Sequence, residues 1–236
     1  MKKNSDNTPY GKDKNSVIYW RNNRNKIKDL YKSEKYFFVK LIKKSNSFLD
    51  VGCASGGFYK IIKKFKNKIL YKGLDVSTNL INSAKYTYGK KKFIKYDGKN
   101  FPKNLNNFDL TFSFGTLHHT KNYFKIIEQM VKKSKKYILF DLRFSKTKNL
   151  ETSYQIIKFS KNYMKNNKIL YNVLNLDIFL KKLVEITNAK YAIFIYGYYN
   201  KPNYNTITKH KKLIMASILI DKTKKYKINI NIKNEK

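Results

Sequence analysis

The sequence predicts an α/β fold in one domain, with a mostly parallel sheet and helices on both faces. Short apolar runs alternate with amphipathic stretches from residue 47 to residue 142, as parallel strands joined by right-handed crossover helices do. Hydrophobic residues make up 42% of the chain, enough to form a compact core. Its 236 residues also fit one core, because α/β folds of roughly 200–250 residues commonly share one.

The elements follow in order along the chain. We expect a flexible polar arm over residues 1–16 and a helical cap over residues 17–45. The helix-like spacing in the cap is interrupted near Ser33, which predicts two helices there. The single domain covers residues 17–221. Its first strands are predicted at 47–51, 71–76, 93–97, 108–114 and 137–142, with helices at 58–65, 80–86 and 123–133.

The last third of the chain changes character. A helix is expected around residues 177–187, before two strand-like runs at 191–198 and 212–220. The loop between these runs contains Pro202, and two strands joined in this way predict an antiparallel hairpin at the sheet edge. Residues 222–236 are polar like the N-terminal arm, which predicts a flexible tail.

The formal net charge of +37 would ordinarily indicate a nucleic-acid partner, because lysine and arginine neutralise phosphates. Only three of the 52 basic residues are arginines, however, and the lysines are spread over every segment. A surface that binds nucleic acid usually includes arginine, whose planar fork recognises phosphates and bases. The charge therefore favours a compositional bias, and nucleic-acid binding stays a less favoured alternative.

Cysteine usage and the terminal residues indicate the compartment. Cys53 is the single cysteine, so no disulfide forms within the chain and a reducing environment is expected. The N-terminus has no apolar segment of the kind that signal peptides contain, and no apolar run is long enough to span a bilayer. We expect a soluble cytoplasmic protein without a metal site.

The strongest local motif is FLDVGCASGGF, in which a strand ends in an acid and a glycine turn precedes a helix. Gly52 permits a tight turn, and Gly56 lets a ligand approach the backbone near the helix N-terminus. A nicotinamide-binding Rossmann protein has G-x-G-x-x-G here, whereas this chain has G-x-A-x-G with Ala54 in the middle. Asp50 would repel a pyrophosphate and suits a cationic amino group, which disfavours a nicotinamide oxidoreductase.

This turn resembles the first motif of class I S-adenosylmethionine-dependent methyltransferases, except that Ala54 replaces a glycine. The resemblance implies that Asp75, at the end of the second strand, binds the ribose hydroxyls, and that Val76 and Leu80 flank the adenine. It implies that Asp97, before Gly98, accepts a hydrogen bond from the adenine amine. Core packing for Leu80 and a solvated turn for Asp97 are the structural alternatives.

The segment FDLTFSFGTLHHT resembles the fourth motif of the small-molecule (type 11) branch, which includes ubiquinone and menaquinone C-methyltransferases. By this resemblance, Ser113 and Phe114, with Gly115, line the methionine end of the cofactor. His118 and His119 begin the next loop and are candidate general bases, because histidine titrates near neutral pH. A purely structural role for this histidine pair is the alternative.

The resemblance covers roughly residues 47–143 and implies a seven-stranded Rossmann-like sheet, with S-adenosylmethionine as cofactor and S-adenosylhomocysteine as product. It implies in-line transfer of a methyl group to oxygen or carbon of a small-molecule acceptor. No Asn/Asp-Pro-Pro-aromatic motif follows the fourth strand, which argues against amino methylation of DNA bases. An RNA or protein methyltransferase of the same fold, and a non-catalytic basic RNA-binding protein, are the alternatives.

Overall fold

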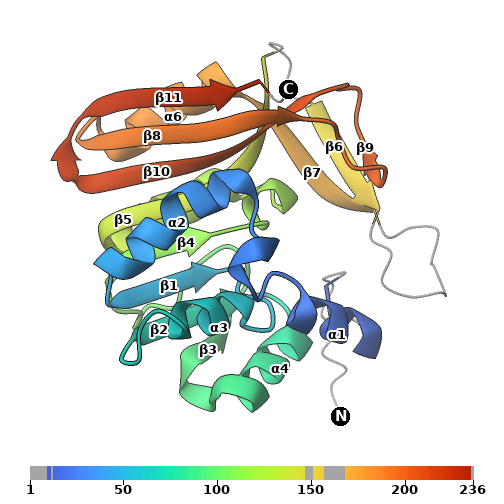
Figure 1. Ribbon diagram of the computed structural model, residues 1–236, viewed down its shortest axis with the longest axis vertical. Coiled ribbons are helices and arrows are strands. Elements are labelled where there is room, and N and C mark those ends of the chain that lie inside the picture. The colour runs from blue at the N-terminus through green and yellow to red at the C-terminus, as the bar shows by residue number, and fades with distance from the viewer. Residues whose placement is uncertain (1–9, 12, 147–150, 157–167, 235–236) are drawn as a thin grey trace.

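A computed structural model describes residues 10–11, 13–146, 151–156 and 168–234. Its main feature is a mixed sheet with the strand order β11-β8-β10-β5-β4-β1-β2-β3 (Figure 1). Neighbouring strands from β3 to β5 are parallel, and β10 is antiparallel to both β5 and β8. The strands are β1 (Ser47–Val51), β2 (Leu70–Asp75), β3 (Phe93–Lys95), β4 (Phe108–Ser113), β5 (Ser134–Ser145), β8 (Tyr191–Asn200), β10 (Leu213–Lys225) and β11 (Lys227–Lys233).

Helices cover both faces of this sheet. They are α1 (Lys14–Asn22), α2 (Lys32–Lys44), α3 (Gly57–Lys63), α4 (Thr78–Tyr88), α5 (Tyr123–Lys133) and α6 (Leu176–Thr187). Phe38 of α2 packs in one apolar cluster and Phe179 of α6 in another. In Figure 1, α2 lies in front of the sheet and α6 behind it. Phe48 and Leu49 of β1 enter opposite clusters, as alternating strand side chains do, so β1 is buried along its whole length.

A small second sheet stands at the carboxyl end of β5 (Figure 1). It consists of β6 (Glu151–Ile156), β7 (Lys168–Asn175) and β9 (Thr206–Ile207), with β6 antiparallel to both others. Two residue pairs, Phe144–Leu174 and Ser145–Asn175, join β7 to β5 in parallel. Short 3-10 helices occur at η1 (Ile27–Asp29), η2 (Lys90–Lys92) and η3 (Leu117–His119).

The predicted α/β fold with a mostly parallel central sheet is confirmed, and every strand and helix that the sequence predicted is present. The expected number of seven strands is wrong, because eleven strands pair within the described residues. The hairpin partners β8 and β10 do pair antiparallel. They do not form the sheet edge, however, because β11 runs parallel to β8 on its outer side.

The two ends of the chain are more ordered than the sequence led us to expect. Within the expected tail, 222–236, β10 continues to Lys225 and β11 follows, with Ile232 packed against the main apolar cluster. In the expected arm, Gly11 accepts a hydrogen bond from Asn79 Nδ2 at 2.7 Å, and α1 already begins at Lys14. Residues 1–9 lie outside the described residues. None of the described helices has the length and apolar character that crossing a membrane requires.

A chain that ends after Lys225 tests whether β11 is part of the fold. Its removal exposes the edge of β8 and the surface beneath Ile232, so we expect a loss of roughly 1–2 kcal/mol, about 2–8 °C in melting temperature. A chain that ends after Lys233 is the control and should melt like the full chain. Equal melting temperatures for all three chains, measured by circular dichroism, would support a flexible tail instead.

Candidate functional site

A cavity of about 420 Å³ opens at the carboxyl ends of the parallel strands. Ligands in open α/β sheets bind at this edge, because the loops that follow the strands meet there. Six of the eleven predicted cofactor-binding residues line the cavity: Gly52, Ala54, Asp75, Val76, Leu80 and Phe114. The other five do not: Asp50, Gly56, Asp97, Gly98 and Ser113.

The turn after β1 brings the backbone against the cavity. Gly52 has a φ of +85°, and a Cβ atom there would lie 2.0 Å from Thr116 Oγ1, so only glycine fits. Ala54 also has a positive φ, of 46°, and its N–H donates to Asp75 Oδ2 at 2.9 Å. The first predicted motif is therefore joined directly to the predicted ribose-binding acid.

Asp75 is a buried carboxylate on the cavity wall. Its Oδ1 accepts a hydrogen bond from Ser77 N at 2.9 Å, while Oδ2 accepts the one from Ala54 N. Burial raises the pKa of Asp75, and these backbone N–H groups act in the opposite direction. Each oxygen keeps a second lone pair, so the carboxylate can still accept hydrogen bonds from a ligand.

Asp50 does not reach the cavity, which corrects its predicted place beside a ligand amino group. Its side chain is buried between the strands, where Tyr71 Oη donates to Asp50 Oδ2 at 2.6 Å. Asp50 Oδ1 has no hydrogen-bond partner among the described residues. Burial raises the pKa of Asp50 to about 7, although the hydrogen bond from Tyr71 opposes the shift.

Asp97 is exposed and Gly98 is half-buried in a turn outside the cavity lining, as in the structural alternative to the predicted adenine contact. Asp97 Oδ1 accepts from Lys99 N and Asn100 N, each at 2.7 Å, and these bonds lower the pKa of Asp97. The preceding residue, Tyr96, lines the cavity instead. Side-chain alternation along the chain places the two neighbours on opposite sides.

Two other predicted residues have structural roles. Ser113 is buried, and its Oγ donates to Val51 O at 2.7 Å, which ties β4 to β1. Gly56 faces Tyr88 and Phe93, where a Cβ atom would lie 2.9 Å from the nearer ring. Both residues therefore pack behind the cavity and do not line its wall.

The N-terminal cap closes one side of the cavity with Tyr19, Trp20 and Arg24, together with Tyr10 from the segment before the cap. Arg21 of the cap points away and donates from Nη2 to Ser83 Oγ at 3.0 Å, which fastens α1 to α4. Tyr10 belongs to the expected flexible arm, and sequence reasoning missed it because no periodic pattern marks residues 1–16.

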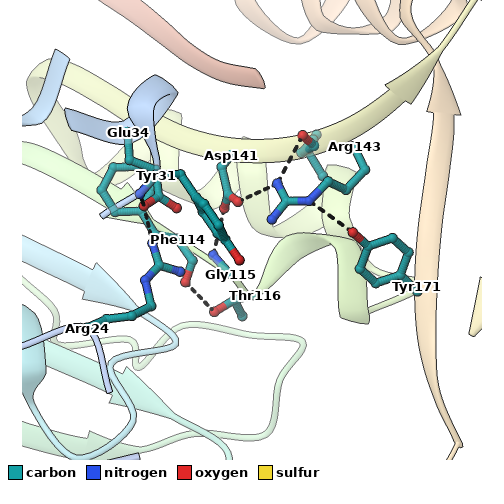
Figure 2. Close-up of polar contacts among 10 residues, drawn as sticks. Arg24, Tyr31, Glu34, Phe114, Gly115, Thr116, Asp141, Arg143 and Tyr171 are labelled. Carbon is teal, nitrogen blue, oxygen red and sulfur yellow. Dashed lines mark hydrogen bonds and ion pairs between the residues drawn. The ribbon is translucent and has the colours of Figure 1, made fainter. Parts of the chain in front are cut away.

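Four charged side chains, three of them buried and Arg24 half-buried, form two ion pairs beside the cavity (Figure 2). Arg24 pairs with Glu34 of α2, and Arg143 Nη1 lies 2.7 Å from Asp141 Oδ2 on β5. The ring of Tyr31 lies between the two guanidinium groups, with their central carbons 5.3 and 5.4 Å from its centroid. Burial raises the pKa of Glu34 to about 6, against the effect of Arg24.

The two predicted histidines stand in η3 and line the cavity. Burial is the main cause that lowers the pKa of His118 well below its usual value and that of His119 to about 4. Both rings are therefore neutral near pH 7. His119 Nδ1 lies 2.7 Å from Leu170 O, and a carbonyl only accepts, so Nδ1 carries the proton and Nε2 has the free lone pair.

The outer part of the cavity comes from segments for which the sequence predicted no function. Tyr171 of β7 packs against His118, with ring centroids 5.1 Å apart. Other outer residues come from β6, β7, the end of β8, β10 and the loop after β8: Gln155, Ile169, Asn200, Lys201, Pro202, Asn203, Tyr204, Asn205, Leu213 and Met215. Within the described ranges, no three His, Cys, Asp or Glu side chains gather in a group that could hold a metal ion.

Part of the sequence is similar to a known protein family. A family model described as a methyltransferase domain matches residues 49–138, which contain the glycine turn, Asp75 and the histidine pair. No curated protein matches the sequence. The prediction of a methyltransferase is thus confirmed by the segment from which it was made.

Solved structures show the same fold at low sequence identity. The N-terminal domain of EvdMO1, solved with SAH and D-fucose, is 11% identical with a TM-score of 0.55, over 78% of this chain and 79% of that chain. The plantazolicin methyltransferase BpumL, in complex with a pentazolic desmethylPZN analog and SAH, is 18% identical with a TM-score of 0.51, over 79% and 80%. The O-methyltransferase of a trans-AT PKS multienzyme of Brevibacillus brevis, in complex with SAH, is 14% identical with a TM-score of 0.52, over 70% and 55%.

Replacing Asp50 by Asn tests the buried carboxyl group. With a pKa of about 7 in the folded protein and an ordinary low value when unfolded, Asp50 binds more protons in the folded state, so its contribution to stability is lost as pH rises through 7. The stability of Asp50→Asn relative to the parent should therefore increase by roughly 1–4 kcal/mol between pH 5 and pH 8.5.

Asp97→Asn is the matched control for this measurement. Its carboxyl group is exposed with a lowered pKa, so it is ionised throughout this pH range. Urea unfolding at pH 5 and pH 8.5 gives the difference in free energy of unfolding between each variant and the parent. A constant difference between Asp50→Asn and the parent would show that the Asp50 carboxyl group does not titrate near pH 7.

Proposed function

Because the chain carries a methyltransferase domain on this fold, we propose that its cavity binds S-adenosylmethionine and serves methyl transfer to oxygen or carbon of a small-molecule acceptor. S-adenosylhomocysteine is then the second product. The observation that carries the proposal is the junction of Gly52, Ala54 and Asp75 on one cavity wall. The SAH named for the structurally similar methyltransferases supports the same cofactor.

The residues present fit this cofactor. Asp75 offers a buried carboxylate for the ribose hydroxyl groups, and Val76 and Leu80 give an apolar surface beside it for the adenine. The absent side chain at Gly52 leaves the backbone open to the ligand. Arg24 lies at the end of the cavity away from Asp75, close to Gly115: a Cβ atom on Gly115 would be 2.7 Å from Arg24 Nη1. The guanidinium of Arg24 suits the methionine carboxylate of the cofactor.

The bound cofactor supplies an activated methyl group on a sulfonium. The protein's remaining tasks are to orient the acceptor, exclude water and take up a proton where the acceptor loses one. Tyr10, Tyr19 and Trp20 cover the cavity from the N-terminal side and keep water away. His119 is the proposed base, because its Nε2 carries a lone pair and its ring is neutral at physiological pH.

Calorimetric titration with S-adenosylmethionine and S-adenosylhomocysteine tests the cofactor assignment. We expect micromolar binding to the parent and at least a ~10-fold loss in Asp75→Asn, because an amide accepts fewer hydrogen bonds than a carboxylate. Asp97→Asn should bind like the parent, since Asp97 is exposed and bonded within its own turn. A folded parent protein that binds neither ligand would overturn the proposed function.

Nitrogen NMR of protein labelled in histidine tests the proposed base without any acceptor. We expect the His119 resonances of a neutral ring with the proton on Nδ1, unchanged from pH 8 to pH 5.5, because its pKa is about 4. His119→Asn assigns these resonances. A His119 ring that becomes protonated near pH 6.5, or that carries its proton on Nε2, would rule out Nε2 as the base at neutral pH.

A further inference from the structure

The described residues that line the cavity include more cationic than anionic side chains, and the carboxylates that pair with two of these cations, Glu34 and Asp141, lie behind the lining. Its permanently cationic side chains are Arg24, Arg143 and Lys201, and Asp75 is its one carboxylate. Asp75 lies at the proposed cofactor end, so it is not available to an acceptor at the other end. The neutral histidine rings add no charge there.

Arg143 is the buried cation at the acceptor end, with 3% of its surface exposed. Its Nε donates to Tyr171 Oη at 3.2 Å, and Nη1 donates to Asp141 Oδ2 at 2.7 Å and to Leu142 O at 3.3 Å. Its Nη2 makes no hydrogen bond with the described part of the chain. In Figure 2 the guanidinium lies between Asp141 and Tyr171, facing Tyr31. An unshared guanidinium donor on the cavity wall is best satisfied by an acidic oxygen of a ligand.

Flat aromatic side chains surround this donor. The central carbon of Arg143 lies 5.4 Å from the Tyr31 ring centroid, and Tyr171 packs edge-on against His118. Tyr31 is 37% exposed and lines the cavity, and because the two guanidinium groups cover its faces, it presents its ring edge, against which the face of an aromatic ligand can pack. Such walls favour a planar group over a branched aliphatic one.

We propose that the acceptor is a planar molecule with an ionised carboxylate, which Arg143 Nη2 binds at the outer end of the cavity and Lys201 attracts at the cavity mouth. This inference rests on the proposed function, because a bound sulfonium cofactor with net positive charge adds to the attraction for an anion. A cationic acceptor would meet Arg143 and Lys201 with no free carboxylate among the described lining residues.

Three isosteric probes separate charge from shape: benzoate, benzamide and benzamidine. The full-length protein is saturated with S-adenosylhomocysteine, and each probe is titrated while the fluorescence of Trp20 is recorded. Trp20 is the single tryptophan of the chain and lines the cavity, so it reports binding without turnover. We expect benzoate to bind at least ~10-fold more tightly than benzamide, and benzamidine to bind most weakly.

Two variants locate the recognition. Arg143→Lys keeps a cation beside Asp141 and removes Nη2, so it should weaken benzoate binding by about 10-fold and leave benzamide binding unchanged. Lys201→Met should weaken benzoate binding by about 2–5-fold, as expected for an exposed charge. Lys212→Met is the matched control, because Lys212 is exposed but does not line the cavity, and it should bind benzoate like the parent.

The outcomes distinguish this inference from the proposed function. The protein can bind S-adenosylhomocysteine and then bind benzoate and benzamide equally well, or bind benzamidine more tightly than benzoate. Either result overturns the carboxylate assignment and leaves the cofactor assignment intact. The absence of binding by all three probes at millimolar concentration also overturns the carboxylate assignment. A benzoate preference that survives in Arg143→Lys and in Lys201→Met overturns the roles of these residues. Failure to bind S-adenosylhomocysteine overturns the proposed function itself.

Discussion

The buried carboxylate of Asp141 near the carboxyl end of β5 is the constraint on which the cavity depends. An unpaired carboxylate there would cost roughly several kcal/mol, so its neighbours must neutralise it. Arg143 pairs with its Oδ2, and the N–H of Gly115 donates to its Oδ1 at 2.6 Å. The second contact holds the loop after β4 against β5. The histidines of η3, which follow in that loop, are thereby placed on the cavity wall.

The same requirement joins the N-terminal cap to the sheet. Arg24 follows α1 and places its guanidinium on Glu34 of α2, on one side of the Tyr31 ring, while Arg143 occupies the other side. Breaking one ion pair would leave a buried charge without its partner, which is costly in a low-dielectric environment. The cap that closes the cavity is therefore held by electrostatics as well as by apolar packing.

The sequence predicted the central sheet because changes of apolar period are set locally. It also predicted that Asp75 ends the second strand, and the structure has it there, on the cavity wall. It did not separate Asp50 from Asp75, because both acids lie near the carboxyl ends of neighbouring strands, and their directions depend on which neighbour, Tyr71 or Ala54, donates to them. Tyr10 and Tyr171 escaped prediction since tertiary contacts alone bring them to the cavity. The alternating Ile and Asn residues of β11 did carry a two-residue period, but its polar composition resembled a tail.

Because acidic residues are scarce in this chain, the positions at which they occur are informative about function. The chain has 15 acidic residues against 52 basic ones, yet five acids are buried among the described residues: Glu34, Asp50, Asp75, Asp141 and Asp221. A compositional drift toward lysine acts most freely on exposed positions, where substitutions cost little. Acids that persist inside, where a charge is expensive, are held by a specific partner or by a ligand. Four of these five lie at or behind the carboxyl edge of the sheet, and this concentration argues that the cavity, rather than the lysine-rich surface, is where function constrains the sequence.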